Sequence, residues 1–364
     1  MSSNTNKVPL ADQGSAGREM HLLISSGGSR AILAGAGVVL ACHHAGISTW
    51  KSIGGISGGS LPTVFMSSGM DAKTTVSTAL DVDFASLLTR RGGMLKILFA
   101  SLMQRRYEKT RPRFGVLSSE KLGTFLETKV SSWPSKYWTL ACVGDDQLIF
   151  TKAGVHQHKP DGTYRLLATE SGPLGAAIRG SCAVPGIIDA VPLEAAGEKF
   201  WLHDGALSKE GRTPASVPER FFGARPQDII VCDVGDGSAV EKKVNKWKLK
   251  WWKIICGELC LPQYDPEPLS EEAGYIMIEP TEFNFSSLQF TLTRDQKWQA
   301  VMSGYMGAIP ALEKAGLLTG QSLATAKKVL ADFEAMVKEC QDNRAKKGTI
   351  AARTEALLSS HGLW

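Results

Sequence analysis

The chain has 364 residues, enough for one large domain or two of ordinary size. Hydrophobic residues make up 43% of the sequence and charged residues 21%, which predicts a packed globular core. The formal net charge of +5 is too mild over this length to favour nucleic acid as a partner.

The N-terminus and the cysteines bear on the compartment. Residues 1–19 are rich in Ser, Asn and Gly and are expected to form a flexible tail without the apolar stretch of a secretory signal. No apolar run reaches the roughly 18 residues of a membrane-spanning helix. The seven cysteines are scattered and mostly lie in apolar runs, which favours a reducing, cytoplasmic environment. Cys256 and Cys260 have no nearby His or Cys partners to complete a zinc site. We expect no metal and no other cofactor.

Strands and helices alternate where the folded region begins. An apolar strand at 21–24 is followed by a tight loop at 25–30 and a helix at 32–45. A second strand then leads into Ser57, and a helix-compatible run covers 61–66. Strand, helix, strand and helix with short connections predict an α/β fold with a mostly parallel, doubly wound sheet.

The rest of the chain predicts further elements of both kinds. Residues 72–130 read as a helical, lid-like insertion, in which an apolar run at 94–103 has basic flanks. Further strands are expected at 137–143, 147–152, 187–202, 228–234 and 275–278, and helices at 172–181, 295–315 and 321–346, before a loosely attached tail at 347–364. We expect one domain over 20–320, followed by a C-terminal helix and tail over 321–364.

The most informative motif is Gly55-Ile56-Ser57-Gly58-Gly59, which matches G-x-S-x-G. This pattern builds a sharp strand-to-helix turn with the serine at its apex, and Gly55 and Gly59 keep side chains out of the crowded backbone there. A plain Gly-rich turn is the alternative reading of so short a motif. The apolar approach before it and the helical run after it favour a nucleophile.

A serine nucleophile needs donors for the oxyanion that forms. Gly27, Gly28 and Ser29 are candidates, because they lie at a strand-to-helix turn where backbone N–H groups point outward and the helix dipole adds positive potential. Arg30 could steady that loop or add charge. A nucleotide-binding loop fits less well because G-x-G-x-x-G is absent.

The base can be read from the order of residues along the chain. Hydrolases with a Ser-acid-His triad place the histidine last, and only His361, near the chain end, follows Asp204. An aspartate that acts directly on the serine is therefore the simpler choice. Asp204 follows the apolar run 200–202, and Gly205 lets the backbone turn away.

Taken together, these motifs resemble the patatin-like phospholipase family. That family combines a Gly-rich oxyanion loop, G-x-S-x-G and a D-G-G/A motif, which appear here in the same order, the last as Asp204-Gly205-Ala206. Residues 177–191, with Ser-Cys-Ala-Val-Pro-Gly, also resemble the family's segment before the aspartate. The similarity covers about 20–315, and Ser26 and Ala31 replace the first and last glycines of the usual loop.

The resemblance implies a three-layer α/β/α sandwich and a Ser57–Asp204 dyad. Such a dyad hydrolyses fatty-acyl esters of phospholipids or lysophospholipids through an acyl-enzyme, with oxyanion donors at Gly27, Gly28 and Gly58. The alternatives are a soluble carboxylesterase or thioesterase with the same dyad, or a non-catalytic lipid-binding effector. Headgroup, acyl-chain and positional preference, any activator and the oligomeric state stay open.

A basic, Trp-rich segment over 241–262 is expected to contact a membrane surface. Trp247, Trp251 and Trp252 are interleaved there with lysines that include Lys248 and Lys250. Tryptophan and lysine together suit the headgroup region of a bilayer. The alternative is a surface helix whose tryptophans pack on the core. The mixture also suits RNA, but no RNA-binding motif accompanies it. We expect a cytoplasmic, peripherally membrane-associated protein.

Overall fold

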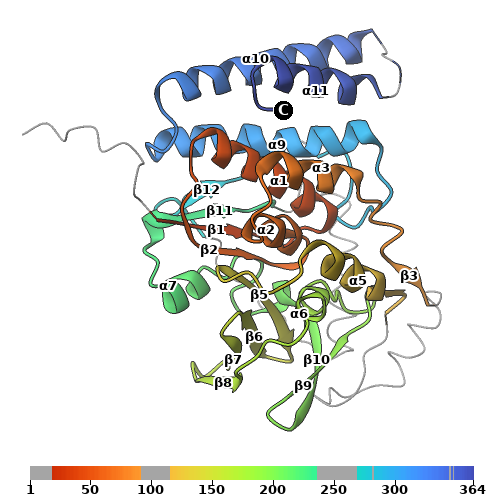
Figure 1. Cartoon of the computed structure of the whole chain (residues 1–364), viewed down its shortest axis with the longest axis vertical. Coiled ribbons are helices and arrows are strands. Elements are labelled where there is room, and N and C mark those ends of the chain that lie inside the picture. Colours follow the sequence, from red (N-terminus) through yellow and green to blue (C-terminus); the bar gives the residue numbers. More distant parts are fainter. Residues whose placement is uncertain (1–18, 92–114, 236–268, 281–282, 344–345, 347) are drawn as a thin grey trace, which may run out of the picture.

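The computed structural model describes residues 19–91, 115–235, 269–280, 283–343, 346 and 348–364 (Figure 1). The Trp-rich segment 241–262, with Trp247, Trp251, Trp252, Lys248 and Lys250, and the apolar run 94–103 lie outside the described residues. None of the described helices is both long enough and apolar enough to cross a bilayer.

A mixed sheet runs through the described part of the chain. Its parallel section has the order β12-β11-β1-β2-β5, and β6, β7 and β8 continue antiparallel from β5. The antiparallel hairpin β9–β10 joins the sheet where β10 pairs with β5. The strands span Met20–Ile24 (β1), Trp50–Gly55 (β2), Tyr137–Val143 (β5), Asp146–Thr151 (β6), Gly154–His158 (β7), Tyr164–Ala168 (β8), Val191–Ala195 (β9), Glu198–Asp204 (β10), Ile229–Cys232 (β11) and Ile276–Ile278 (β12).

Helices cover the sheet because its strands are apolar on both faces. Leu22 and Ile24 pack into the core beneath α1, α2 and α9, whereas Leu23 faces a second core that includes Val217 of α7. The α/β class with three layers is thereby confirmed. The helices span Gly28–His44 (α1), Ser60–Ser67 (α2), Ala72–Asp81 (α3), Glu120–Lys129 (α5), Leu174–Ser181 (α6), Ser216–Phe222 (α7), Arg294–Lys314 (α9), Gly320–Asp342 (α10) and Thr349–Ser360 (α11).

Helix α9 packs on α1 with the two backbones in contact. A Cβ atom on Gly304 would lie 1.9 Å from the Ala34 carbonyl oxygen, and one on Gly37 would lie 1.8 Å from that of Val301. Real Cβ contacts are never this short, so both glycines are needed for this approach. The position of α1, and of the loop that opens it at Gly28, therefore depends on α9.

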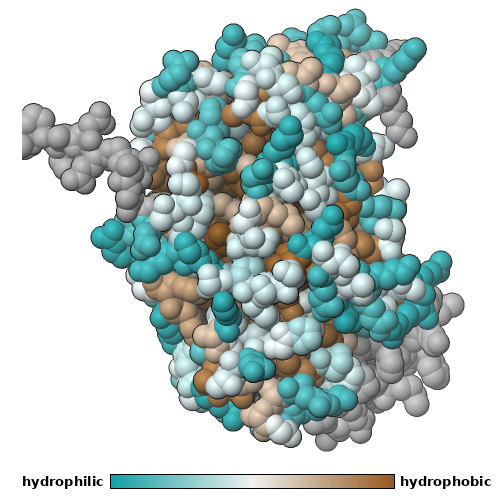
Figure 2. Space-filling model, viewed as in Figure 1, coloured by the Kyte–Doolittle hydropathy of each residue, from teal (hydrophilic) through white to brown (hydrophobic). Residues whose placement is uncertain are grey.

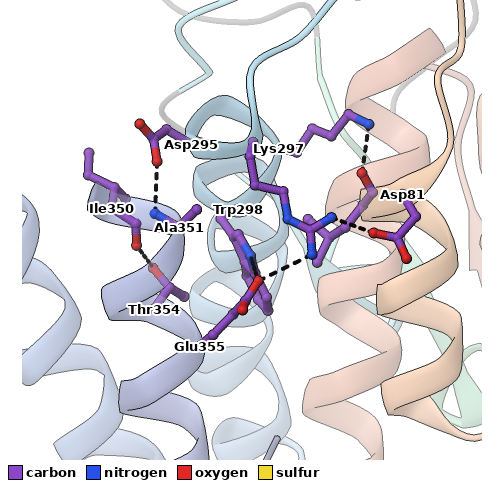
Figure 3. A network of polar contacts seen from close by, with 10 residues as sticks. Asp81, Asp295, Lys297, Trp298, Ile350, Ala351, Thr354 and Glu355 are labelled. Atoms are coloured by element: carbon purple, nitrogen blue, oxygen red, sulfur yellow. Dashed lines mark hydrogen bonds and ion pairs between the residues drawn. The ribbon is translucent and has the colours of Figure 1, made fainter. Parts of the chain in front are cut away.

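The described parts of the 72–130 insertion are not purely helical. Helices α3 and α5 are separated by the short strands β3 (Thr89–Arg90) and β4 (Leu117–Ser118), which pair with each other. The buried Lys297 of α9 holds the insertion to the core, since its Nζ donates to the Leu80 and Val82 carbonyls at the C-terminal end of α3; Figure 3 shows the Lys297 side chain reaching toward α3. A cation at the C-terminal end of a helix also interacts favourably with the helix dipole.

Helices α10 and α11 form an outer layer beyond α9, at the top of Figure 1. Where a loose tail was expected, α11 is held by α9: Asp295 accepts from the backbone amides of Gly348 at 2.6 Å and Ala351 at 2.8 Å. Glu355 accepts from the Trp298 indole at 2.9 Å (Figure 3). The ring of Trp364 packs edge-on against that of Trp298, which ties down the end of the chain.

Candidate active site

Ser57 sits at a strained turn between β2 and α2. Its φ angle of 52° lies in the left-handed region that side-chain-bearing residues rarely adopt. A Cβ atom on Gly55 would lie 2.2 Å from the Gly59 carbonyl oxygen, and one on Gly59 would lie 2.5 Å from that of Ile24. The strand–turn–helix context that G-x-S-x-G requires is therefore present, with the glycines where the backbone is most crowded.

The Gly-rich loop at the start of α1 lies against this turn. Gly28 has a φ of +55°, and a Cβ atom on Gly58 would lie 2.2 Å from the Gly28 carbonyl oxygen. Within the described residues, no backbone carbonyl accepts from the amides of Gly27, Gly28 or Gly58. The first amides of a helix have no acceptor within the helix and carry its positive dipole end. Gly28, Ser57 and Gly58 line one cavity, so the amides of Gly28 and Gly58 are candidate oxyanion donors there, and Gly27 stays a proposed donor next to them.

Ser29 differs from its two glycine neighbours. Its backbone N–H donates to the Ser287 carbonyl at 2.9 Å, and its hydroxyl donates to the same oxygen at 3.1 Å. An amide committed to a carbonyl cannot also stabilise an oxyanion, so the expectation that Ser29 supplies a donor is corrected. Ser287 lies far along the chain, and nothing in the local sequence signals this contact.

Arg30 holds the same distant segment. Its side chain is 2% exposed, and Nε donates to the Phe285 carbonyl at 2.7 Å while the guanidinium lies 5.0 Å from the centre of the Phe283 ring. Since Ser287 contacts both Gly28 and Ser29, Arg30 fixes the segment on which the Gly-rich loop rests. Support of the Gly-rich loop therefore stays the role that we propose for Arg30.

Strand β5 brings Asp204 to Ser57. Strand β6 pairs along one edge of β5, so β2 and β10 share the other edge. Gly55 is opposite Thr139, and Asp204 is opposite Ala141, two residues further along β5. Two residues of strand correspond to about 7 Å. Asp204 therefore lies just beyond the end of β2, where the chain turns into Ser57.

The Asp204 carboxyl is buried, with 4% of the residue exposed. Oδ1 accepts from the Ala206 amide at 2.9 Å. Burial raises its pKa to about 6, and the Ala206 amide and the Ser57 hydroxyl oppose this rise. Oδ2 has no well-aligned hydrogen bond within the described residues, so the Ser57 contact that lowers the pKa is a loose one. The hydrogen bond between a nucleophile and its base is commonly long or poorly aligned before substrate binds.

Two further hydrogen bonds reach the site from the end of α6. The Ser57 backbone N–H donates to Ser181 Oγ at 3.0 Å, and the Asp204 N–H donates to the Ala183 carbonyl at 3.0 Å. The sequence singles out 177–191 as a family-like segment but gives Ser181 no role. Its contact partner could have been found only through the fold.

An apolar cavity opens at Ser57. Its walls include described parts of the 72–130 insertion, the turn after α6 and the segment before α9. The lining residues are Gly28, Ile32, Ser57, Gly58, Leu61, Phe84, Leu87, Leu88, Leu122, Cys182, Val184, Ile188, Leu288 and Phe290. Among these residues Leu288 is 42% exposed. On the face of the molecule drawn in Figure 2, hydrophobic residues are interspersed with hydrophilic ones. The described residues include no cluster of His, Cys, Asp and Glu that could hold a metal ion.

Comparison with known proteins assigns the family. The family model for patatin-like phospholipase matches residues 22–212, just over half of the chain, including Ser57 and Asp204. VipD from Legionella pneumophila is similar in structure, with 13% identity over 94% of this chain and 79% of VipD and a TM-score of 0.45. Human GIVD cytosolic phospholipase A2 has 13% identity over 85% of this chain and 59% of its own, with a TM-score of 0.39. No curated protein sequence matches. On the family match, the chain belongs to the patatin-like phospholipase family, a family of lipid acyl hydrolases.

Proposed function

We propose that this protein hydrolyses fatty-acyl esters of phospholipids or lysophospholipids with Ser57 as nucleophile and Asp204 as base. The observation that carries the proposal is the shared edge of β5, which brings a buried carboxylate to a serine at a strained turn. A carboxyl with a pKa of about 6 is ionised at neutral pH and is a stronger base than an exposed aspartate.

In the first half of the reaction, Ser57 Oγ attacks the acyl carbonyl carbon and its proton passes to Asp204. The carbonyl oxygen becomes an oxyanion, which the amides of Gly27, Gly28 and Gly58 stabilise. The ester C–O bond then breaks, and the proton on Asp204 moves to the leaving alcohol oxygen. The products of this half are a free lysolipid or glycerol-phosphate alcohol and an ester of Ser57.

In the second half, water replaces the alcohol. Asp204, again ionised, takes a proton from water as its oxygen attacks the acyl-enzyme carbonyl. The same amides stabilise the second oxyanion, and collapse returns the proton to Ser57 Oγ and frees the fatty acid. Each step uses only residues of this chain and a water molecule.

The cavity supports a fatty-acyl substrate over a small polar ester. The side chains around Ser57 are mainly those of Leu, Ile, Val and Phe, which favour contact with an alkyl chain over water. Leu88 and Leu288, from opposite parts of the sequence, both lie in this lining. An alkyl chain bound here would place its ester carbonyl near Ser57 and the Gly28 amide.

A lipid substrate is presented at a surface, so we also propose that the protein binds membranes peripherally from the cytoplasmic side. The support is the composition of 241–262, where tryptophans and lysines alternate. The exposed Leu288 in the lining of the cavity is consistent with a site that opens toward lipid.

The catalytic proposal is tested with Ser57→Ala and Asp204→Asn on a defined mixture of phospholipids, with released products identified by mass spectrometry. We expect wild type to release fatty acids and to be labelled on Ser57 by a fluorophosphonate, and each variant to lose at least about 1000-fold in kcat. A folded wild type that neither releases fatty acid nor reacts with the probe would instead favour a non-catalytic lipid-binding protein.

The substrate class is tested by comparing a water-soluble monomeric ester with phospholipid vesicles. We expect the vesicle rate to exceed the monomer rate, and Trp251→Ala with Trp252→Ala to lower only the vesicle rate. Equal rates on both substrates, unchanged in the double variant, would point to a soluble carboxylesterase or thioesterase with the same dyad.

A further inference from the structure

We infer that the turn Ser181–Val184 at the end of α6 is the positioning element of the active site, and that Ser181 positions the nucleophile through the backbone amide of Ser57. This inference rests on the proposed function, because it assigns a role in the same site. It also gives a purpose to the Ser-Cys-Ala-Val segment, which neither the dyad nor the oxyanion loop uses.

The first contact acts on the strained residue itself. Ser57 has a φ of 52°, a conformation that persists only where the surroundings hold it. The Ser181 hydroxyl is fully buried and accepts from the Ser57 N–H at 3.0 Å. This bond fixes the peptide plane before Ser57, and rotation of that plane would swing Oγ away from Asp204. It also commits the amide of Ser57, so the oxyanion donors begin at Gly58.

The second contact acts on the base. The Asp204 N–H donates to the Ala183 carbonyl at 3.0 Å. Ser181 and Ala183 are two residues apart on one turn, so the backbone between them sets the distance between their partners. The nucleophile and the base are remote in sequence, but both are hydrogen-bonded to the same short segment, which sets their relative position.

The turn is itself rigidly placed. The amide of Cys182 donates to the Ile178 carbonyl at 3.0 Å and that of Ala183 to the Gly180 carbonyl at 3.1 Å, which continue the last turn of α6. A Cβ atom on Gly180 would lie 2.6 Å from Leu202 Cδ1, so α6 presses against β10 two residues before Asp204. Cys182 and Val184 also line the cavity, which joins the positioning turn to the acyl-binding wall.

The test is the pair Ser181→Ala and Ser181→Thr, with Thr151→Ala as the matched control. Thr151 also has a buried hydroxyl that accepts from a backbone amide, that of Ala153 at 3.2 Å, but it lies at the turn between β6 and β7. We expect Ser181→Ala to lower kcat and the rate of fluorophosphonate labelling by about 10- to 100-fold, with KM little changed. Ser181→Thr should recover most of the rate, and Thr151→Ala should match wild type.

Two readouts separate positioning from loss of fold. Since the Ser57 hydroxyl stabilises the Asp204 carboxylate, a displaced Ser57 should move the acid limb of kcat/KM to higher pH in Ser181→Ala. Hydrogen exchange at the Ser57 amide should be slow in wild type and Ser181→Thr and faster in the alanine variant. If Ser181→Ala does not fold, Ser181→Cys, whose thiol is a weaker acceptor, should show the same changes in smaller degree.

A Ser181→Ala enzyme with wild-type kcat, acid limb and Ser57 amide exchange would overturn the inference while leaving the proposed function intact. Failure of the proposed function is seen separately, as absence of hydrolysis and labelling in wild type. Even then hydrogen exchange tests the contact between Ser181 and the Ser57 amide, because it needs no turnover. A Ser57 amide that exchanges equally fast with and without the Ser181 hydroxyl would contradict the inference.

Discussion

Asp204 is buried, yet its proposed role requires the charged form. With a pKa of about 6, the carboxylate is the main species at neutral pH and is lost below it. We expect kcat/KM on a monomeric ester to rise with pH through an apparent pKa of about 6 and then to level off. A profile that stays flat to about pH 4.5 would show that a different group takes the proton.

The same burial predicts a conflict between stability and activity at Asp204. Its pKa rises from 3.8 to about 6 on folding. Between these two pH values the native state therefore binds more protons than the unfolded state. The free energy of unfolding therefore falls as pH rises from 3.8 to 6. Above pH 6 the buried carboxylate lowers the free energy of unfolding by its full amount, about 3 kcal/mol.

Asp204→Asn removes this charge and keeps an oxygen that can accept from the Ala206 amide. We expect the variant to melt at a higher temperature than wild type at pH 7.5 and the difference to shrink toward pH 4, while activity is lost. Thermal unfolding at both pH values checks this. A variant less stable than wild type at pH 7.5 would mean that the interactions of the carboxylate in the folded state outweigh the free-energy cost of burying its charge.

Candidate site residues can be picked out from the sequence where their signal is local, and the proposed nucleophile and base are of this kind. The nucleophile turn and the Asp-Gly-Ala motif are short patterns whose residue types are dictated by backbone crowding and proton transfer. Ser29 could not be judged in this way, because its amide is taken by Ser287, and Ser181 was passed over for the same reason. A hydrogen bond between distant segments leaves no local pattern.

At the scale of elements, the contact between α1 and α9 is the most demanding in the fold. Gly304→Ala would force a Cβ atom to within 1.9 Å of the Ala34 carbonyl oxygen, so we expect the helices to part and the melting temperature to fall sharply. Since α1 begins with the Gly28 loop, activity should fall as well, measured on the same monomeric ester.

Gly307→Ala is the matched control in the same helix. Its added Cβ atom would meet nothing closer than 3.4 Å, and alanine favours a helix over glycine by about 0.5–1 kcal/mol. We expect this variant to be as stable as wild type or slightly more so. Equal destabilisation by both substitutions would contradict the close contact at Gly304.

Elements with a strong repeating pattern were predicted, and weak ones were not. The buried strands β1 and β5 are continuously apolar, and buried residues of the long helix α9 recur every three or four positions, as at Val301, Tyr305, Ala308 and Leu312. Strand β8 has no clear alternation, and its Leu166 is exposed. The sequence of α11 does not indicate a helix, because a helix of this length gains its stability from packing, here on α9, more than from its own sequence.

At the scale of the whole molecule, the outer layer of α10 and α11 is joined to the core through α9. Asp295 is central to this, because it accepts from the backbone amides of Gly348 and Ala351 at the start of α11; the Ala351 contact is drawn in Figure 3. We expect Asp295→Ala to cost about 1–2 kcal/mol and to speed hydrogen exchange over α11 while β1 and β2 stay protected.

Glu339→Ala serves as the control for Asp295→Ala. Glu339 also joins α10 to α11, through an ion pair with Arg353 at 2.7 Å, but this pair lies at the surface, where such contacts add little. Exchange over α11 should then match wild type. If Asp295→Ala leaves exchange over α11 unchanged, the other contacts of α11 with α9, such as the Glu355–Trp298 hydrogen bond, are sufficient to hold it.

The contacts of the Gly28 loop with Phe285 and Ser287 have a consequence for biosynthesis. A growing chain that has left the ribosome as far as Asp204 already carries the nucleophile and the base. It still lacks Phe285 and Ser287, whose carbonyl oxygens accept hydrogen bonds from Arg30 and Ser29, and it lacks helix α9, which packs on α1. Nascent chains that end before α9 should therefore lack a fixed Gly28 loop, and the proposed hydrolysis should begin only after α9 has been made.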